Sequence, residues 1–337
     1  MKRITSFSIA MVLLCGGISA SAADYKVQTR YSVAGHDGWD YISVDSTGRR
    51  IYVSHGVRVN VLDADTGAQV GTIEDTPGVH GIAVAGKLKH GFTSNGKEDK
   101  VTMFDTEKLT VIKKIDVGQG PDGIYFNGAT QRVFTNNHKS HDITAIDATT
   151  GAVVGTVKVD GNGEGAASKE GLVYVALEDK SEIAVFDAKT LEVKQRFPLT
   201  SVKAPTGLAL DGKNNRIFVG GHNKTMAVLD ATTGKEITTL PIGGGTDAAG
   251  FDAKEGLIFF SNGEGNLTVI QQKGPDQYVA LDPVTTQAGA KTMAFDKKTG
   301  KIFLPTATVN VTPAADPSQK PTKTIVDGTF VVLVVGK

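Results

Sequence analysis

The chain has 337 residues, with 36 Lys and Arg against 36 Asp and Glu, so its formal net charge is zero. This balance offers no basic surface for nucleic acid, and no apolar run after the N-terminus reaches the roughly 18 residues of a membrane span. Glycine is frequent and apolar residues alternate with polar ones, a pattern that predicts an all-β protein.

The N-terminal residues 1–23 are typical of an export signal. Lys2 and Arg3 give a positive start, residues 9–14 form a short apolar core, and "SASAA" is a small-residue cleavage site. We therefore expect a periplasmic protein in which residues 24–337 form a single domain.

Cys15 is the only cysteine of the chain, and it lies inside this signal. The exported protein is therefore expected to contain no thiol, disulfide or cysteine-ligated metal. A lipoprotein would have a small residue before the cysteine, but Leu14 stands there, so no lipid anchor is predicted.

The pentapeptide "DATTG" and its variants recur along the chain with a regular spacing. The aspartate can accept hydrogen bonds from the amides that follow it, and glycine adopts a positive φ at little cost, so each copy predicts a tight turn between two strands. Successive aspartates are separated by 42, 42, 40 and 43 residues: Asp63, Asp105, Asp147, Asp187 and Asp230.

Each unit of about 42 residues contains four short β patterns, of which the second carries an aromatic residue. Four strands in such a repeat indicate one blade of a β-propeller. The aromatic strand occurs seven times, so the sequence predicts a seven-bladed propeller: "IYVSH", "GFTSN", "RVFTNN", "LVYVAL", "RIFVGG", "LIFFSN" and "KIFLPT".

The two ends of the chain complement each other. The stretch 25–35 resembles a fourth strand without a preceding blade, and the final residues resemble a third strand without a successor. We expect the N-terminal strand to complete the last blade, which leaves no long strand edge exposed. The Pro- and Thr-rich residues 306–327 interrupt this blade and predict an inserted loop.

The aromatic strands "YVSH", "FTSN", "FTNN" and "FVGG" give the chain its resemblance to the YVTN-repeat propellers, which are related to the lactonase and quinoprotein propellers. The resemblance covers the expected mature chain and implies secretion. It specifies the architecture more than the activity, because related propellers include lactonases, binding proteins and surface proteins.

The alignment of the units places one residue per blade where the innermost strand enters the central channel. We call these seven the mouth residues: Asp40, His80, Asp122, Glu164, Thr206, Asp247 and Lys291. The ends of the second strands form an outer circle on the same face: His55, Asn95, Asn137, Leu177, Gly221, Asn262 and Thr306.

Histidines gather on this face, which we therefore predict to be the functional one. Six map to it, and only His90 maps to the opposite face: His36, His55, His80, His138, His141 and His222. His138 and His141 form either a chelating pair or a solvated loop. Trp39, the only tryptophan, either stacks on a ligand ring or covers the core.

Carboxylates that converge at the channel mouth repel one another unless a cation, Lys291 or a raised pKa relieves the charge. A bare polar rim that solvates the strand ends is one interpretation. A divalent cation, Ca²⁺ or Zn²⁺, is the other, with Glu164, Asp122, Asp247 and Asn262 as candidate ligands.

We expect a monomeric binding or scaffold protein that recognises a small ligand, a metal ion or a protein partner through this face. The alternative is a metal-dependent, lactonase-like hydrolase in which the bound cation activates water. The signatures of serine hydrolases, zincins and P-loop proteins are missing. The "DATTG" turns are similar to quinoprotein repeats, but they lack the tryptophan that follows in those repeats, which argues against a quinone cofactor.

Overall fold

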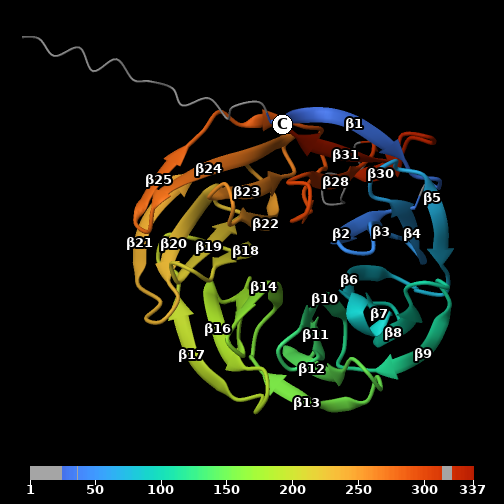
Figure 1. The fold of residues 1–337 in the computed structure, drawn as a ribbon, viewed down its shortest axis with the longest axis horizontal. Coiled ribbons are helices and arrows are strands. Elements are labelled where there is room, and N and C mark those ends of the chain that lie inside the picture. Colours follow the sequence, from blue (N-terminus) through green and yellow to red (C-terminus); the bar gives the residue numbers. More distant parts are fainter. Residues whose placement is uncertain (1–24, 36, 313–320) are drawn as a thin grey trace, which may run out of the picture.

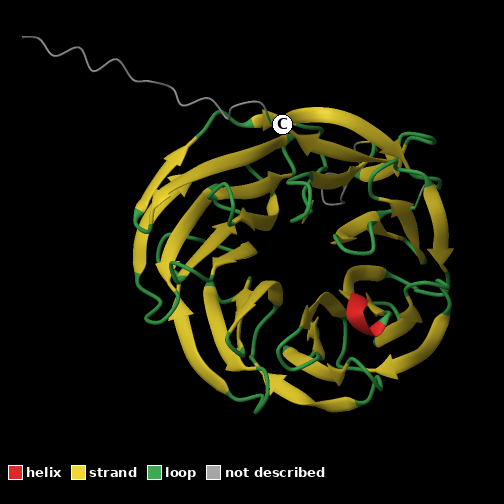
Figure 2. Cartoon of the chain, in the orientation of Figure 1, coloured by secondary structure: helices red, strands yellow, loops and turns green. Residues whose placement is uncertain are grey.

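A computed structural model describes residues 25–35, 37–312 and 321–337. They form a ring of seven antiparallel four-stranded blades, which confirms the predicted propeller (Figure 1). Strands account for nearly all the regular structure, and the described residues include one short 3-10 helix, η1 (Gly86–Leu88) (Figure 2). Within these residues, no helix has the length and apolar character needed to cross a membrane.

Blades 1 to 5 each contain four strands that are consecutive in the chain, from the innermost to the outermost. Blade 1 is β2 (Trp39–Asp45), β3 (Arg50–His55), β4 (Arg58–Asp63) and β5 (Gln69–Ile73); blade 2 is β6 (Val79–Ala85), β7 (His90–Asn95), β8 (Lys100–Asp105) and β9 (Val111–Asp116); blade 3 is β10 (Pro121–Asn127), β11 (Arg132–Asn137), β12 (Asp142–Asp147) and β13 (Val153–Lys158); blade 4 is β14 (Gly163–Lys169), β15 (Leu172–Leu177), β16 (Glu182–Asp187) and β17 (Val193–Pro198); blade 5 is β18 (Pro205–Asp211), β19 (Arg216–Gly221), β20 (Thr225–Asp230) and β21 (Glu236–Pro241).

Blades 6 and 7 depart from this scheme. In blade 6 the third strand also pairs with a short additional strand, and in blade 7 the N-terminal strand is outermost. Blade 6 is β22 (Thr246–Asp252), β23 (Leu257–Asn262), β24 (Asn266–Gly274) and β25 (Gln277–Ala280), with β26 (Val284–Thr285); blade 7 is β27 (Ala294–Phe295), β28 (Ile302–Thr306), β31 (Val331–Gly336) and β1 (Lys26–Ser32). The pairing of β1 with β31 confirms the predicted closure of the ring.

The hydrophobic core lies between neighbouring blades. The second and third strands of each blade are largely buried, whereas the outermost strands of blades 2 to 4 expose most of their residues. The aromatic side chains of the second strands lie in these interfaces, as between Phe134 of blade 3 and Phe186 of blade 4, whose ring centroids are 5.3 Å apart. Burial of apolar surface on both faces of a blade is what stabilises the ring.

The repeated pentapeptide closes the turn between the third and fourth strands, as predicted. In blade 3, Asp147 Oδ1 accepts hydrogen bonds from the amides of Thr149 and Thr150, at 3.0 and 2.8 Å, and from the Thr150 hydroxyl at 2.9 Å. Gly151 adopts a φ of 64° and donates its amide hydrogen to the Asp147 carbonyl. These hydrogen bonds also hold the pKa of Asp147 below its usual range.

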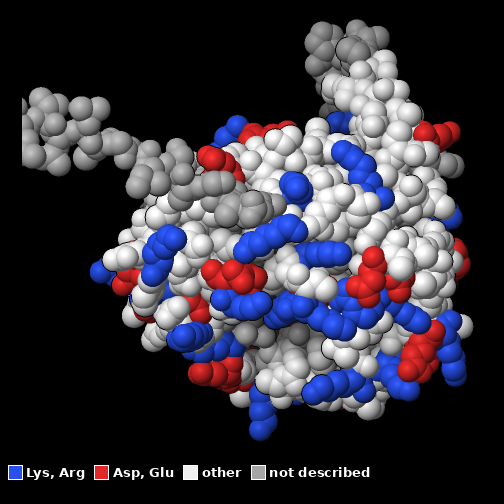
Figure 3. All heavy atoms as spheres, turned by 45° about the horizontal axis from the view of Figure 1, so that its top comes forward, with Lys and Arg blue, Asp and Glu red and all other residues white. Residues whose placement is uncertain are grey.

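The insert predicted as a loop at residues 306–327 contains a β-hairpin that is not part of any blade. Its strands β29 (Val309–Thr312) and β30 (Thr322–Ile325) pair antiparallel, from Val309 opposite Ile325 to Thr312 opposite Thr322. In Figure 3 a column of mostly uncharged residues rises from the body of the propeller at the place of this hairpin. The β-branched residues at alternate positions, Val309 and Val311 in β29 and Thr322 and Thr324 in β30, favour such strands, although the prolines of the segment suggested a loop.

Candidate functional site

The mouth residues stand where the innermost strands begin. Six of them lie in β2, β6, β10, β14, β18 and β22, and Lys291 precedes β27. These strands surround the axis of the ring in Figure 1. Equivalent positions in the repeat therefore meet at one end of the axis, although they are up to 251 residues apart in the chain.

An ion-paired belt joins most of the mouth residues. Lys291 Nζ lies 2.5 Å from Asp247 Oδ2 and 3.1 Å from Asp40 Oδ1. The second oxygen of Asp40 accepts a hydrogen bond of 2.7 Å from His80 Nδ1, and the same nitrogen lies 4.0 Å from Asp122 Oδ2. The belt therefore crosses blades 6, 7, 1, 2 and 3 without interruption.

His138 carries the belt on to blade 4. Its Nε2 donates a hydrogen bond of 2.8 Å to the Gly163 carbonyl and lies 3.4 Å from Glu164 Oε1. The carbonyl can only accept, so the proton is on Nε2. The other ring nitrogen, Nδ1, faces Asp122 Oδ2 at 3.5 Å. The spacing of the sequence repeat does not single out His138, because it follows the second strand.

Tyr41 reaches into the same site from blade 1. Its hydroxyl donates a hydrogen bond of 3.0 Å to Glu164 Oε2, on the opposite side of the ring from blade 1. The residue after the mouth residue is glycine in blades 2 to 5, where a Cβ would press on the next blade; at Gly165 it would lie 2.3 Å from the Thr206 carbonyl oxygen. Tyr41 was not among the predicted site residues, although a tyrosine at a position that is glycine in four other blades is a signal visible in the sequence.

Asp40 and His80 each stabilise the charged form of the other. Burial alone would raise the pKa of Asp40, but the hydrogen bond from His80 and the charge of Lys291 outweigh it and keep this pKa below its usual range. The hydrogen bond to Asp40 raises the pKa of His80 above its ordinary value. Burial disfavours the charge of Lys291, yet Asp247 and Asp40 raise its pKa.

The other three carboxyls have pKa values above their ordinary range. Burial is the largest cause for Asp122, Glu164 and Asp247, and at Glu164 the negative charges of the other two add to it. Burial also raises the pKa of Tyr41 well above its ordinary value, so its hydroxyl stays protonated and can donate to Glu164. The site thus holds more negative charge than Lys291 neutralises.

Three side chains of the belt are placed as metal ligands would be. Asp40, His80 and Asp122 each offer one ligand atom, and these atoms all lie within 4.8 Å of one another. Asp122 Oδ1 is buried and has no hydrogen-bond partner among the described residues. His138 Nδ1 lies beside this group, held by the hydrogen bond that its other nitrogen makes to a backbone carbonyl, as is usual for metal-binding histidines.

Of the four predicted cation ligands, only Asp122 belongs to this group, and Glu164, Asp247 and Asn262 do not. Asn262 is fully buried and its amide is used within blade 6: Oδ1 accepts from Thr246, and Nδ2 donates to Asn266 and Thr268. Asp247 lies against Lys291 instead of the histidines. Without Asn262, the ligand set of the lactonase-like alternative is incomplete.

The rest of the outer circle is likewise structural. His55 is completely buried, donates a hydrogen bond of 2.9 Å from Nδ1 to Asn60 Oδ1, and packs on Phe330 with ring centroids 4.6 Å apart. Burial lowers the pKa of His55, so the ring is neutral. The spacing that placed these residues at one level could not show that their side chains point into the blades.

The remaining predicted residues have separate surroundings. Thr206 is buried and its hydroxyl donates to the Thr246 carbonyl, so blade 5 contributes no charge to the belt. His222 lies 3.7 Å from Glu178 Oε1 and remains half-exposed. His141 is exposed and does not join the belt. His36 lies outside the described residues.

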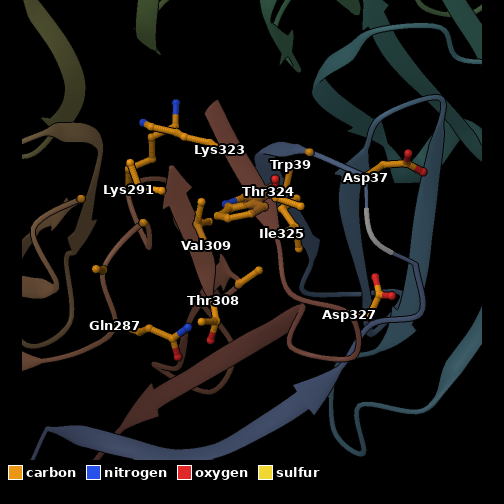
Figure 4. Close-up of a pocket in the computed structure, with 16 residues that line it drawn as sticks. Asp37, Trp39, Gln287, Lys291, Thr308, Val309, Lys323, Thr324, Ile325 and Asp327 are labelled. Carbon is orange, nitrogen blue, oxygen red and sulfur yellow. The ribbon is translucent and has the colours of Figure 1, made fainter. Parts of the chain in front are cut away.

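Trp39 lines a pocket of about 1120 Å³ next to the mouth. Its ring packs on Phe330 with centroids 5.5 Å apart, so the indole does cover the core on one side. Figure 4 shows its indole among Thr324, Ile325 and Val309, with Lys291 at the side of the same pocket. Lys291 therefore belongs both to the belt and to the wall of this pocket.

Comparisons with known proteins support the fold. The family model PQQ_2, described as outer membrane protein assembly factor BamB, matches residues 139–301, which is a similarity over slightly less than half of the chain. No curated protein matches the chain.

Solved structures resemble it over nearly the whole length, at identities that show the fold alone. U3-55K superposes with a TM-score of 0.76 at 9% identity, covering 94% of this chain and 99% of that chain. A chain of the mitotic checkpoint complex gives 0.74 at 14%, covering 97% and 99%. A chain of Kuenenia stuttgartiensis hydrazine synthase gives 0.71 at 15%, covering 88% and 98%. This chain is thus a seven-bladed propeller with BamB-like similarity in its central blades.

Proposed function

We propose that the protein is an exported, YVTN-type binding scaffold whose channel mouth binds one divalent cation of the Zn²⁺ class. The observation that carries the proposal is the group formed by Asp40, His80 and Asp122, with ligand atoms within 4.8 Å of one another. The blades hold these side chains on three separate strands, so the group is fixed by the fold and not by a flexible loop.

The charge of the site supports a cation. Burial raises the pKa values of Asp122, Glu164 and Asp247, which means that their charged forms are insufficiently compensated. A divalent cation would compensate them and would satisfy Asp122 Oδ1. Imidazole nitrogen favours Zn²⁺ over Ca²⁺, which prefers oxygen ligands, so His80 and His138 decide between the two ions of the sequence-based prediction.

Two features support a periplasmic place of action. The N-terminal residues 1–23 have the composition of an export signal. The central blades are similar to a family described as an outer membrane assembly factor. We propose that the propeller presents its cation-binding face to a ligand or protein partner in that compartment.

The proposal is tested by calorimetric titration of metal-free protein with Zn²⁺ and, separately, with Ca²⁺. We expect one Zn²⁺ per chain and much weaker Ca²⁺ binding. Asp122→Asn should lower the affinity for Zn²⁺ at least about tenfold, since it removes a charged ligand. Because protons compete for His80, whose pKa is raised, affinity should fall as the pH decreases through that pKa.

Asp116→Asn is the matched control, because Asp116 is exposed at the end of β9 and pairs only with Lys100 among the described residues. It should leave the affinity for Zn²⁺ unchanged. Absence of saturable Zn²⁺ binding, or an equal loss in both variants, would refute a cation site at the mouth.

A further inference from the structure

The pocket next to the mouth is a second candidate site, built by the inserted hairpin. The hairpin strands β29 and β30 form one wall, and the segments that precede β2 and β27 form the other (Figure 4). Its volume of about 1120 Å³ slightly exceeds the usual range of small-molecule sites, so a small ligand has room there.

The walls of the pocket are mainly apolar. Val309 and Val311 come from β29, Ile325 from β30, and Trp39 from the start of β2. Trp39 packs on Phe330 and also lines the pocket, so its indole belongs both to the core and to the pocket wall. An indole beside aliphatic side chains suits a flat, apolar ring.

One polar group of this wall lacks a partner. Trp39 Nε1 is buried and makes no hydrogen bond to any described residue. A buried N–H donor without an acceptor destabilises the protein, so an oxygen atom supplied by a ligand would be favourable there. The indole N–H can only donate, which selects a ligand that carries an acceptor.

The charged side chains that line the pocket favour a negatively charged ligand. Four charged residues line the pocket, and three of them are engaged: Lys291 pairs with Asp40 and Asp247, Asp37 pairs with Arg58 at 3.4 Å, and Asp327 is not free either. Lys323 of β30 lines the same pocket and has no ion-pair partner within the described part of the chain. An ammonium group beside an apolar wall, without a carboxylate of its own, is suited to the carboxylate of a ligand.

We propose that this pocket binds a small aromatic carboxylate. The ring lies between Trp39 and the aliphatic side chains of the hairpin, a ligand oxygen accepts from Trp39 Nε1, and the carboxylate pairs with Lys323. This site goes beyond the proposed cation site and does not depend on it, since neither Trp39 nor Lys323 is a member of the cluster at the mouth.

The test uses three probes of nearly equal shape: naphthoate, neutral naphthamide and cationic naphthylmethylammonium. Binding is measured by calorimetry and by the emission of Trp39, which reports on this pocket alone because the chain has no other tryptophan. We expect saturable binding of naphthoate with a change in emission, about tenfold weaker binding of naphthamide, and no binding of the cation.

Substitutions in the pocket test which residues cause the preference for naphthoate. Lys323→Met should bring the affinity for naphthoate down to that for naphthamide, because only the charged contact is lost. Val309→Asp should weaken both probes by placing a carboxylate in the apolar wall. Lys301→Met is the matched control, since Lys301 directly precedes β28 and is not among the residues that line this pocket, and it should change neither affinity.

Thermal unfolding of each variant verifies that it is folded. The proposal is overturned if none of the probes binds saturably, if the three bind equally, or if Lys301→Met reduces naphthoate binding as much as Lys323→Met does. Failure of Zn²⁺ binding with retained naphthoate binding would overturn the cation site alone.

Discussion

The channel mouth concentrates four carboxyl groups around one lysine, and Glu164 is the member that the site compensates least. Asp40 has His80 and Lys291 as partners, and Asp247 has Lys291. Glu164 has only the hydroxyl of Tyr41 and the edge of His138. Its charged form is therefore a source of instability in the folded protein without a cation.

This instability gives a prediction with a defined pH dependence. Folding raises the pKa of Glu164 well above its ordinary value of 4.5, so the folded chain holds the proton more tightly than the unfolded chain. Stability must then decrease as the pH rises from 4.5 through the raised pKa. Glu164→Gln removes this loss and keeps an acceptor for Tyr41, so at neutral pH its melting temperature should exceed that of the wild type.

The difference in melting temperature should disappear below pH 4.5, where both side chains are uncharged. Glu107→Gln is the control, because Glu107 is 61% exposed and forms a surface pair with Lys89. It should change the unfolding free energy by less than about 0.5 kcal/mol at any pH. A Glu164→Gln variant less stable than the wild type at neutral pH would contradict the argument.

The site was partly predictable at the scale of residues. The period of the repeat gave the level of each mouth residue, and five of the six charged or imidazole-bearing ones form a continuous belt in the structure. The period of the repeat could not show whether a side chain points into the channel or into a blade. His55 and Asn262 lie at the expected level but turn into the blades. Tyr41 and His138 reach the belt because their long side chains extend from neighbouring positions.

At the scale of elements, the Asp turn is the device that fixes each hairpin. Three hydrogen bonds to Asp147 Oδ1 hold the turn of blade 3, and the same pattern recurs at Asp63 and Asp230. Each of these turns ends in a glycine with positive φ, Gly67, Gly151 or Gly234. Local hydrogen bonding therefore explains why the pentapeptide recurs, independently of any ligand.

Asp147→Ala should lower the unfolding free energy by about 1–2 kcal/mol, since the amides of the turn lose their acceptor. Chemical denaturation with urea measures the change. Asp116→Ala removes an equally short acid that is 89% exposed and should cost less than about 0.5 kcal/mol. Equal losses in the two variants would show that the turn hydrogen bonds contribute nothing beyond surface charge.

The inserted hairpin shows the limit of sequence-based prediction for elements. The strands of the blades have both a period and buried neighbours, so their pattern is strong. In contrast, β29 is largely exposed and its pattern gives no buried face. The pairing of β29 with β30 depends on two segments that are separated in sequence, and the prolines between them resemble those of a loop.

At the scale of the whole molecule, the ring is closed by a strand from the other end of the chain. β1 pairs with β31 from Lys26 opposite Gly336 to Ser32 opposite Val331. The side chain of Tyr31 contributes to the core of blade 7, with its ring 6.4 Å from that of Phe303. Loss of β1 would expose the edge of β31 and part of this core.

A variant that lacks residues 25–33 should therefore have a lower melting temperature and should self-associate, because an uncovered strand edge pairs with another chain. Light scattering after size-exclusion chromatography measures the association. A peptide of residues 25–34, added in trans, should restore the monomer and raise the melting temperature by occupying the edge of β31.

The same peptide with Tyr31→Asp and Val33→Asp is the control. Both residues are at least 93% buried, with 7% and 4% of their surface exposed, so charges there oppose docking while the backbone can still pair. In the full-length chain the same double substitution should lower the melting temperature, which tests the closure without any truncation. If the truncated protein stays monomeric with an unchanged melting temperature, blades 1 to 6 and the three remaining strands of blade 7 form a stable ring without β1.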